Sequence, residues 1–117
     1  MFKEKLAISI NNGIPEVKPQ NLKDHVKDLT VVDVRRPEEF IGELGHIEGA
    51  KLITLGNDLV QFLQNGDREK EIIFVCKSGG RSGQATAFSQ ELGYKNTANM
   101  IGGMILWNEL KYPIHLL

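Results

Sequence analysis

Two short apolar segments constrain the fold of this chain more than any other feature. They are "LTVVDV" at residues 29–34 and "EIIFVC" at residues 71–76, and both are rich in β-branched side chains. Segments of this length and composition are typical of strands that are buried on both faces of a parallel sheet. Residues 51–55 and 97–101 are weaker strand candidates.

Helical patterns lie between these strands. Residues 57–66 begin with a candidate cap, Asn57, and end at a glycine, and residues 81–93 carry one apolar stripe before a terminal glycine. Shorter helices are expected at residues 19–28, 36–40 and 103–110. The alternation predicts an α/β domain with a mostly parallel sheet, in which ligands gather at the carboxyl ends of the strands.

Chain length and composition indicate one globular domain. The 117 residues contain no internal repeat or low-complexity tract, and we expect an N-terminal extension at residues 1–14 and the domain at residues 15–117. The extension could form a surface helix or an additional edge of the sheet. No segment approaches the roughly 20 apolar residues of a membrane span, and the first residues do not resemble a secretory signal. We therefore expect a cytoplasmic protein.

Charge and cysteine content exclude several functions. Fourteen basic and fifteen acidic side chains give a net charge of -1, with the two signs interspersed. This balance gives no support for a nucleic-acid or membrane partner. One cysteine cannot form an internal disulfide, and the three histidines lie far apart, so no metal site is expected.

The single cysteine lies at the end of an expected strand, directly before a glycine-rich turn. Gly79 and Gly80 can take backbone conformations that other residues avoid, so that successive amide N–H groups point inward and form an anion cradle. The start of the next helix and the cations of Lys77 and Arg81 would also stabilise a thiolate and lower the cysteine pKa. We therefore expect Cys76 to be a nucleophile.

Simpler interpretations compete with this one. A free cysteine at a strand end is commonly a small buried hydrophobe. The glycine turn, the two cations and the helix start together favour chemistry at Cys76. For Ser82, an ordinary helix N-cap is preferred to a catalytic hydroxyl.

The length of the loop separates chemical classes. Cysteine-dependent phosphatases use a C-x5-R loop, whereas four residues separate Cys76 from Arg81. The shorter loop makes a tighter pocket, which suits one sulfur atom carried on the cysteine better than a phosphoryl group. A phosphatase or arsenate reductase would need a loop one residue longer. No sequence motif pairs the cysteine with a histidine and an Asn or Asp as in a protease, although such partners need not be adjacent.

Four segments in the same order resemble the rhodanese-like sulfurtransferases. They are "VVDVRRPEEF" (31–40), "GHIEGA" (45–50), "VCKSGGRS" (75–82) and "GYKNTANMIGGMILW" (93–107). The resemblance covers roughly residues 16–113. It implies a rhodanese-like α/β fold, with a five-stranded, mostly parallel sheet flanked by helices on both faces.

The resemblance also implies a mechanism. The catalytic Cys76 thiolate would attack the sulfane sulfur of a donor, form a persulfide and pass the sulfur to a thiol or cyanide acceptor, with no cofactor or metal. Asp33 and Arg35 would support the loop from the neighbouring strand end by charge-assisted hydrogen bonds. Substrate and persulfide would be bound by the loop residues Lys77, Ser78, Gly79, Gly80, Arg81 and Ser82. The remaining conspicuous side chains are expected to be structural: His46, Met100, Met104 and Trp107.

The donor is expected to be thiosulfate or a low-molecular-weight persulfide such as glutathione persulfide. Two-domain thiosulfate enzymes of the family tend to carry a basic residue where this chain has Glu39, which disfavours thiosulfate. Residues 39–56 and 76–82 look more like single domains associated with persulfide dioxygenases. Candidate partners are therefore a sulfane-sulfur donor, a thiol acceptor, and a protein sulfur acceptor or persulfide dioxygenase. The alternative function is a non-catalytic binding or regulatory module, although such domains often lack the cysteine.

Overall fold

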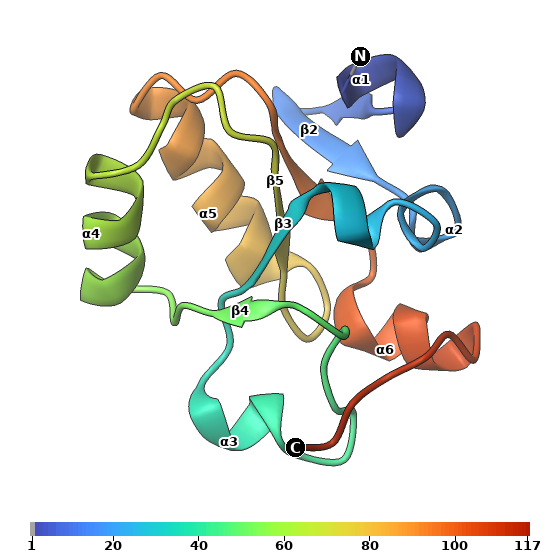
Figure 1. Cartoon of the computed structure of the whole chain (residues 1–117). Coiled ribbons are helices and arrows are strands. Elements are labelled where there is room, and N and C mark those ends of the chain that lie inside the picture. Colours follow the sequence, from blue (N-terminus) through green and yellow to red (C-terminus); the bar gives the residue numbers. More distant parts are fainter. Residues whose placement is uncertain (1) are drawn as a thin grey trace.

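One mixed sheet forms the centre of the molecule. The computed structural model describes residues 2–117, and its six strands follow the order β1-β2-β6-β5-β3-β4 (Figure 1). Neighbouring strands are parallel except β1 and β2, which form an antiparallel pair. The strands are β1 (Ser9–Asn11), β2 (Ile14–Val17), β3 (Thr30–Asp33), β4 (Lys51–Leu52), β5 (Ile72–Val75) and β6 (Thr97–Met100). The α/β class is confirmed, with six strands in place of the expected five.

The additional edge comes from the N-terminal residues. Both alternatives for residues 1–14 occur within the described chain, because a short helix precedes strand β1. The side chains of Phe2 and Leu6 are buried in the same apolar cluster as Val17 and Trp107. The expected boundary after residue 14 falls within strand β2, which begins at Ile14 and pairs with β1. The first residues therefore pack against the core.

Helices cover both faces of the sheet, as the sequence predicts (Figure 1). The expected helix at residues 19–28 is divided into an α-helical turn and a 3-10 turn. Asn57 is the first residue of its helix and not the cap, because Gly56 takes the cap position with φ +127°. No helix among residues 2–117 is both long and apolar enough to cross a membrane. The helices are α1 (Phe2–Lys5), α2 (Pro19–Leu22), η1 (Val26–Asp28), α3 (Pro37–Phe40), α4 (Asn57–Gln64), α5 (Gly80–Glu91) and α6 (Gly103–Glu109).

Strand β5 separates two apolar clusters. Ile73 and Val75 face the cluster that includes residues of α1, α2 and α6, whereas Ile72 and Phe74 face the cluster that includes residues of α4 and α5. This alternation follows from the two-residue period of a strand. The residue after the strand, Cys76, continues it and lies on the side of α4 and α5. The end of β5 therefore places the cysteine beside the N-terminal end of α5.

Truncation of Leu6 tests whether the first residues belong to the folding unit. Leu6 is fully buried, so Leu6→Ala should lower the free energy of unfolding by about 3 kcal/mol through lost apolar burial and the cavity that remains. Ile10 on β1 is 60% exposed, and Ile10→Ala should change it by less than about 0.5 kcal/mol. Urea denaturation measures both. Equal effects of the two variants would contradict this assignment.

Candidate active site

The Cys76 sulfur lies in a small cradle of hydrogen-bond donors. The backbone N–H of Gly79 donates to Cys76 Sγ over 3.0 Å, and the Ser82 hydroxyl lies 3.1 Å from the same atom. The cysteine is only 1% exposed. A buried residue that served only as a hydrophobe would not require two polar donors on its sulfur. The contacts instead suit a sulfur that carries negative charge.

The loop reaches this shape through one glycine and not two. Gly79 has φ +112° and is the N-cap of α5, so the expectation of an unusual backbone conformation is confirmed there. Gly80 is simply the first residue of the helix. The N-cap interpretation of Ser82 is wrong, because its position inside the first helical turn points the hydroxyl at the sulfur.

The pKa of Cys76 reflects opposing effects. Burial raises the pKa of the thiol. Hydrogen bonds lower it by more than burial raises it, and they come from the Ser82 hydroxyl and from the backbone N–H groups of Ser82, Gly79 and Ser78. The net result is a pKa below the ordinary thiol value. Hydrogen-bond donors thus favour the thiolate, which is the nucleophilic form of cysteine.

The first turn of α6 holds the cysteine loop from the other side. The backbone N–H groups of Met104 and Ile105 donate to the carbonyl oxygens of Cys76 and Lys77 over 2.9 and 3.0 Å. Gly103 permits this approach, because a Cβ there would clash with both carbonyl oxygens, and its φ of +57° disfavours other residues. The loop is therefore fixed between two helices.

Asn99 is part of the site, although no local sequence signal indicated it. Its Oδ1 accepts a hydrogen bond from Ser82 over 2.6 Å, and its Nδ2 donates to the carbonyl oxygen of Gly79 over 3.2 Å. Asn99 lies on β6, next to β5, and is 4% exposed. Only the pairing of these two strands brings it to the base of the loop.

Arg81 is engaged by a carboxylate. Its two terminal nitrogens donate to the two oxygens of Glu39 over 2.7 and 2.9 Å. The pKa of Glu39 is lowered to about 2, mainly by these hydrogen bonds. The sequence predicted Arg81 as a cation beside the cysteine, and in the structure its charge is largely balanced by Glu39.

Asp33 and Arg35 form a second ion pair, which is buried. Arg35 Nε and Nη2 donate to the two Asp33 oxygens over 2.9 and 2.7 Å, and Nη2 also donates to the Gly45 carbonyl oxygen. Within the described chain, the side-chain hydrogen bonds of this pair go to each other and to Gly45, with none to the cysteine loop. The pair therefore braces the segment after α3.

The other conspicuous residues have structural surroundings. His46 Nδ1 lies 2.9 Å from the Phe40 carbonyl oxygen, and the two rings stack with centroids 3.7 Å apart. Met100, Met104 and Trp107 belong to the apolar core, as expected. Among residues 2–117, no group of three His, Cys, Asp or Glu side chains could hold a metal ion.

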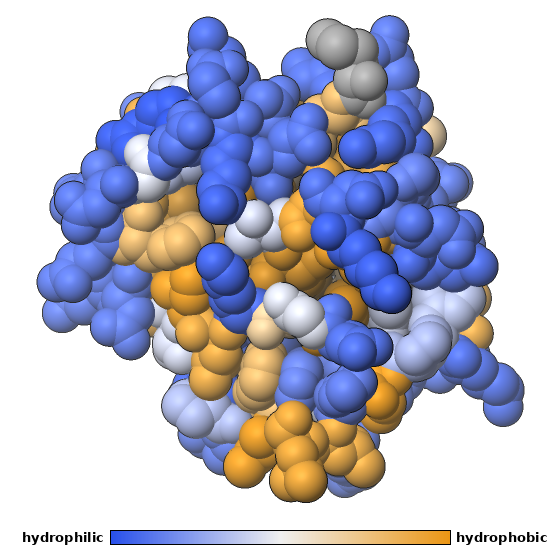
Figure 2. Space-filling view, in the orientation of Figure 1, coloured by the Kyte–Doolittle hydropathy of each residue, from blue (hydrophilic) through white to orange (hydrophobic). Residues whose placement is uncertain are grey.

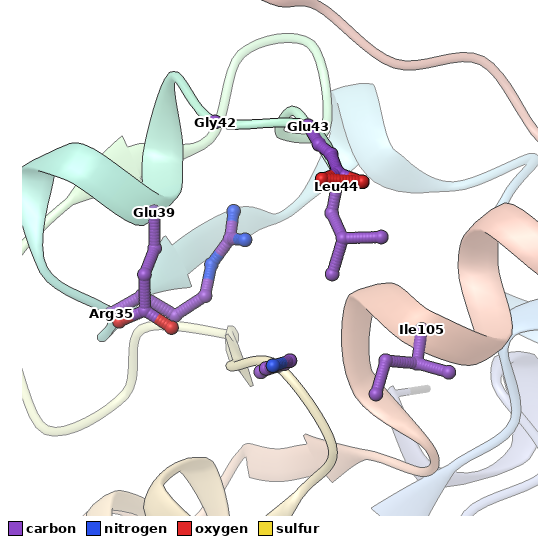
Figure 3. A pocket seen from close by; sticks show the side chains of 7 residues that line it. Arg35, Glu39, Gly42, Glu43, Leu44 and Ile105 are labelled. Carbon is purple, nitrogen blue, oxygen red and sulfur yellow. The ribbon is translucent and has the colours of Figure 1, made fainter.

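A pocket of about 330 Å³ opens beside the cysteine loop. In Figure 3, Arg35 and Glu39 lie on one side of it and Leu44 and Ile105 on the other. Its wall also contains Lys77, from the cysteine loop. Figure 2 shows hydrophobic side chains gathered around the C-terminal end of the chain. The pocket thus combines opposite charges with an apolar wall.

Known proteins are similar to this chain in sequence and in fold. A model of the rhodanese-like domain matches residues 18–110. The putative sulfurtransferase YtwF of Bacillus subtilis is 36% identical over 97 residues, which cover 80% of this chain and 90% of YtwF. The thiosulfate sulfurtransferase GlpE of Pseudomonas paraeruginosa is 32% identical over 83 residues, which cover 71% of this chain and 72% of GlpE. Some relatives are longer, and the chain spans 25% of one of them.

A solved structure agrees with these relatives. The human single-domain sulfurtransferase TSTD1 has a TM-score of 0.72 against this chain at 29% identity. The match covers 83% of this chain and 97% of TSTD1. The fold expected from the four sequence segments is therefore confirmed.

The charge of Glu39 should stabilise the fold in a pH-dependent manner. A carboxyl whose folded pKa lies below its ordinary value of 4.5 adds stability above that value, and the contribution disappears as the pH falls toward 2. Glu39→Gln should lower the free energy of unfolding at pH 7 by about 1 kcal/mol, a figure reduced for the partial exposure of the pair. The difference from wild type should shrink as the pH falls from about 5 to 3.

Denaturant titrations at several pH values measure this difference. Glu43→Gln is the matched control, because Glu43 also lines the pocket and forms no ion pair with another residue in the range 2–117. It should leave the stability nearly unchanged. A Glu39→Gln effect of the same size at pH 3 and pH 7 would show that the charge of Glu39 is not responsible.

Proposed function

The chain belongs to the rhodanese-like domain family, and we propose that it carries sulfane sulfur as a persulfide on Cys76. Its named relatives support sulfurtransferase activity of the rhodanese type. The observation that carries the proposal is the pair of hydrogen bonds donated to Cys76 Sγ by Gly79 and Ser82. They favour the thiolate that the first chemical step requires.

The reaction consists of two sulfur transfers. In the first, the Cys76 thiolate attacks the outer sulfur of a donor persulfide, R–S–SH. The donor S–S bond breaks, and its electron pair leaves with the donor as R–S⁻. In the second, an acceptor thiolate attacks the outer sulfur of Cys76–S–SH. The new S–S bond then breaks, and its electron pair returns to Cys76 Sγ. Such covalent exchange gives ping-pong kinetics.

The charges around the loop favour a persulfide donor over thiosulfate. Glu39 binds both terminal nitrogens of Arg81 and largely balances its charge, so this arginine attracts a dianion less strongly. Arg35 is likewise engaged by Asp33. Lys77 is exposed and forms no ion pair with a described residue, so it remains as a cation at the pocket. One available cation suits a larger donor with separated charged groups better than a compact dianion.

The neighbouring pocket suits a small peptide or amino-acid thiol. Lys77 can bind a carboxylate of such a molecule, and the exposed carboxylate of Glu43 can bind its ammonium group. Leu44 and Ile105 offer apolar contact to the carbon atoms between these charges. Glutathione and its persulfide have this combination of groups. We therefore propose glutathione persulfide, or a closely related persulfide, as the donor or product.

A non-catalytic binding module is supported less well. A domain that only recognises a partner does not require a cysteine sulfur that accepts hydrogen bonds, a lowered cysteine pKa and a loop fixed between two helices. The arrangement at Cys76 provides all three.

Sulfur loading tests the proposal directly. The reduced protein should gain the mass of one sulfur atom after brief exposure to glutathione persulfide, and the gain should be smaller with thiosulfate at equal concentration. Cyanide should remove the added sulfur. Intact-mass spectrometry measures each state, and Cys76→Ser, which lacks the nucleophile, should show no gain.

Two outcomes would contradict the proposal. Failure of a folded protein with a free thiol to gain sulfur from either donor would favour the binding module. Faster loading by thiosulfate would support Cys76 as a sulfur carrier but contradict the preference for a persulfide donor.

A further inference from the structure

One hydroxyl proton on Ser82 faces two acceptors. Ser82 Oγ lies 3.1 Å from Cys76 Sγ and 2.6 Å from Asn99 Oδ1. All three residues are buried, so water does not readily supply a substitute donor. A serine hydroxyl has a single proton and can donate it to only one of them at a time. The short distance to Asn99 makes its amide oxygen a strong competitor for this proton.

The other contacts of Asn99 fix the direction of its amide. Its Nδ2 lies 3.2 Å from the carbonyl oxygen of Gly79 and 3.4 Å from a carboxylate oxygen of Glu16. Both oxygens only accept hydrogen bonds, so the amide nitrogen must face them and Oδ1 must face Ser82. Asn99 is also paired with Glu16 in the β2–β6 ladder, which holds its backbone in place.

The strength of Cys76 Sγ as a hydrogen-bond acceptor depends on whether the cysteine is a thiol, a thiolate or a persulfide, whereas Asn99 Oδ1 stays the same. A Cys76 thiol can donate its own proton to Ser82 Oγ while Ser82 donates to Asn99. A Cys76 thiolate can only accept, and as a charged acceptor it attracts the hydroxyl proton more strongly. In the persulfide, Sγ is a neutral bridging sulfur and a weak acceptor, so the hydroxyl can return to Asn99.

We propose that Asn99 is a positioning residue that competes with Cys76 for the hydroxyl proton of Ser82. The inference rests on the proposed role of Cys76 as a sulfur carrier. When the outer sulfur leaves with the acceptor, the electron pair of the broken S–S bond stays on Sγ, and the Ser82 hydrogen bond turns from Asn99 to that charge. When sulfur is loaded, the hydrogen bond turns back. Because strongly stabilised thiolates are weaker nucleophiles, the competition by Asn99 keeps Cys76 reactive.

Several charged groups surround Cys76 besides this hydrogen-bonded chain. Lys77 is its neighbour in the loop, and Arg81 on α5 is paired with Glu39 on α3. Asp33 and Arg35 form their pair at the end of β3. Glu16 on β2 lies behind Asn99 and reaches it through Nδ2. The variants that test the proposal leave all of these charges in place.

The test compares Ser82→Ala, Asn99→Leu and the double variant in the unloaded protein. The pKa of Cys76 is obtained from the pH dependence of its alkylation by iodoacetamide, followed by intact mass. Ser82→Ala should raise this pKa, because a donor to the thiolate is lost. Asn99→Leu should lower it, because Ser82 then donates to the thiolate without competition. The double variant should match Ser82→Ala, because Asn99 acts through Ser82.

A purely structural role of Asn99 predicts the opposite shift. Loss of its hydrogen bond to the Gly79 carbonyl would loosen the loop, weaken the Gly79 N–H donor and raise the pKa of Cys76. A raised pKa in Asn99→Leu, or a double variant that differs from Ser82→Ala, would overturn the proposal. Because no sulfur donor is used, failure of sulfur loading would not affect this result.

A measurement on the wild-type protein covers the case in which Asn99→Leu does not fold. The NMR shift of the Asn99 side-chain carbonyl should change with pH and with the same midpoint as the alkylation of Cys76, since ionisation withdraws the Ser82 hydrogen bond. In Ser82→Ala, this change should be lost. A carbonyl shift that stays constant through the midpoint in wild type would overturn the proposal.

Discussion

A buried thiolate is stable only where hydrogen-bond donors replace water, and the structure around Cys76 is organised by this requirement. Strand β5 carries the sulfur into the interior, where burial alone would favour the neutral thiol. Gly79 and Ser82 supply the donors that reverse this preference, and both positions depend on the start of α5. The first turn of α6 donates hydrogen bonds to the carbonyl oxygens of the cysteine loop. The N–H groups of the loop itself face the sulfur.

Charge plays a secondary part at this site. The two arginines nearest the loop are each bound by a carboxylate, Arg35 by Asp33 and Arg81 by Glu39. The main effects that lower the pKa of Cys76 are hydrogen bonds, led by the Ser82 hydroxyl. A nearly neutral surrounding has a functional consequence, because a strongly cationic pocket would favour compact dianions. The mixed charges and apolar wall of the adjacent pocket suit a larger thiol or persulfide better.

The sequence predicted the elements whose signals are local. The β-branched segments at residues 29–34 and 71–76 identified strands β3 and β5, and the glycine turn identified the anion cradle. It could not identify Asn99, because this residue reaches the loop only when β6 pairs with β5. The partner of Arg81 was missed for the same reason, since Glu39 is distant in sequence. Ser82 was misassigned as a cap because the helix begins two residues earlier than the expected cap, at Gly80. Strand β2 escaped detection because it is short and contains Pro15, which breaks the usual strand pattern.

We propose that hydrogen bonds, and not a neighbouring cation, stabilise Cys76 as a thiolate. The most direct measurement is the pH titration of the thiolate ultraviolet absorbance in wild type and in the double variant Glu39→Gln/Arg81→Gln, which removes both charges of the ion pair. We expect the pKa of Cys76 to stay below the ordinary thiol value in both proteins. A rise to the ordinary value in the double variant would show instead that the charge of Arg81 stabilises the thiolate.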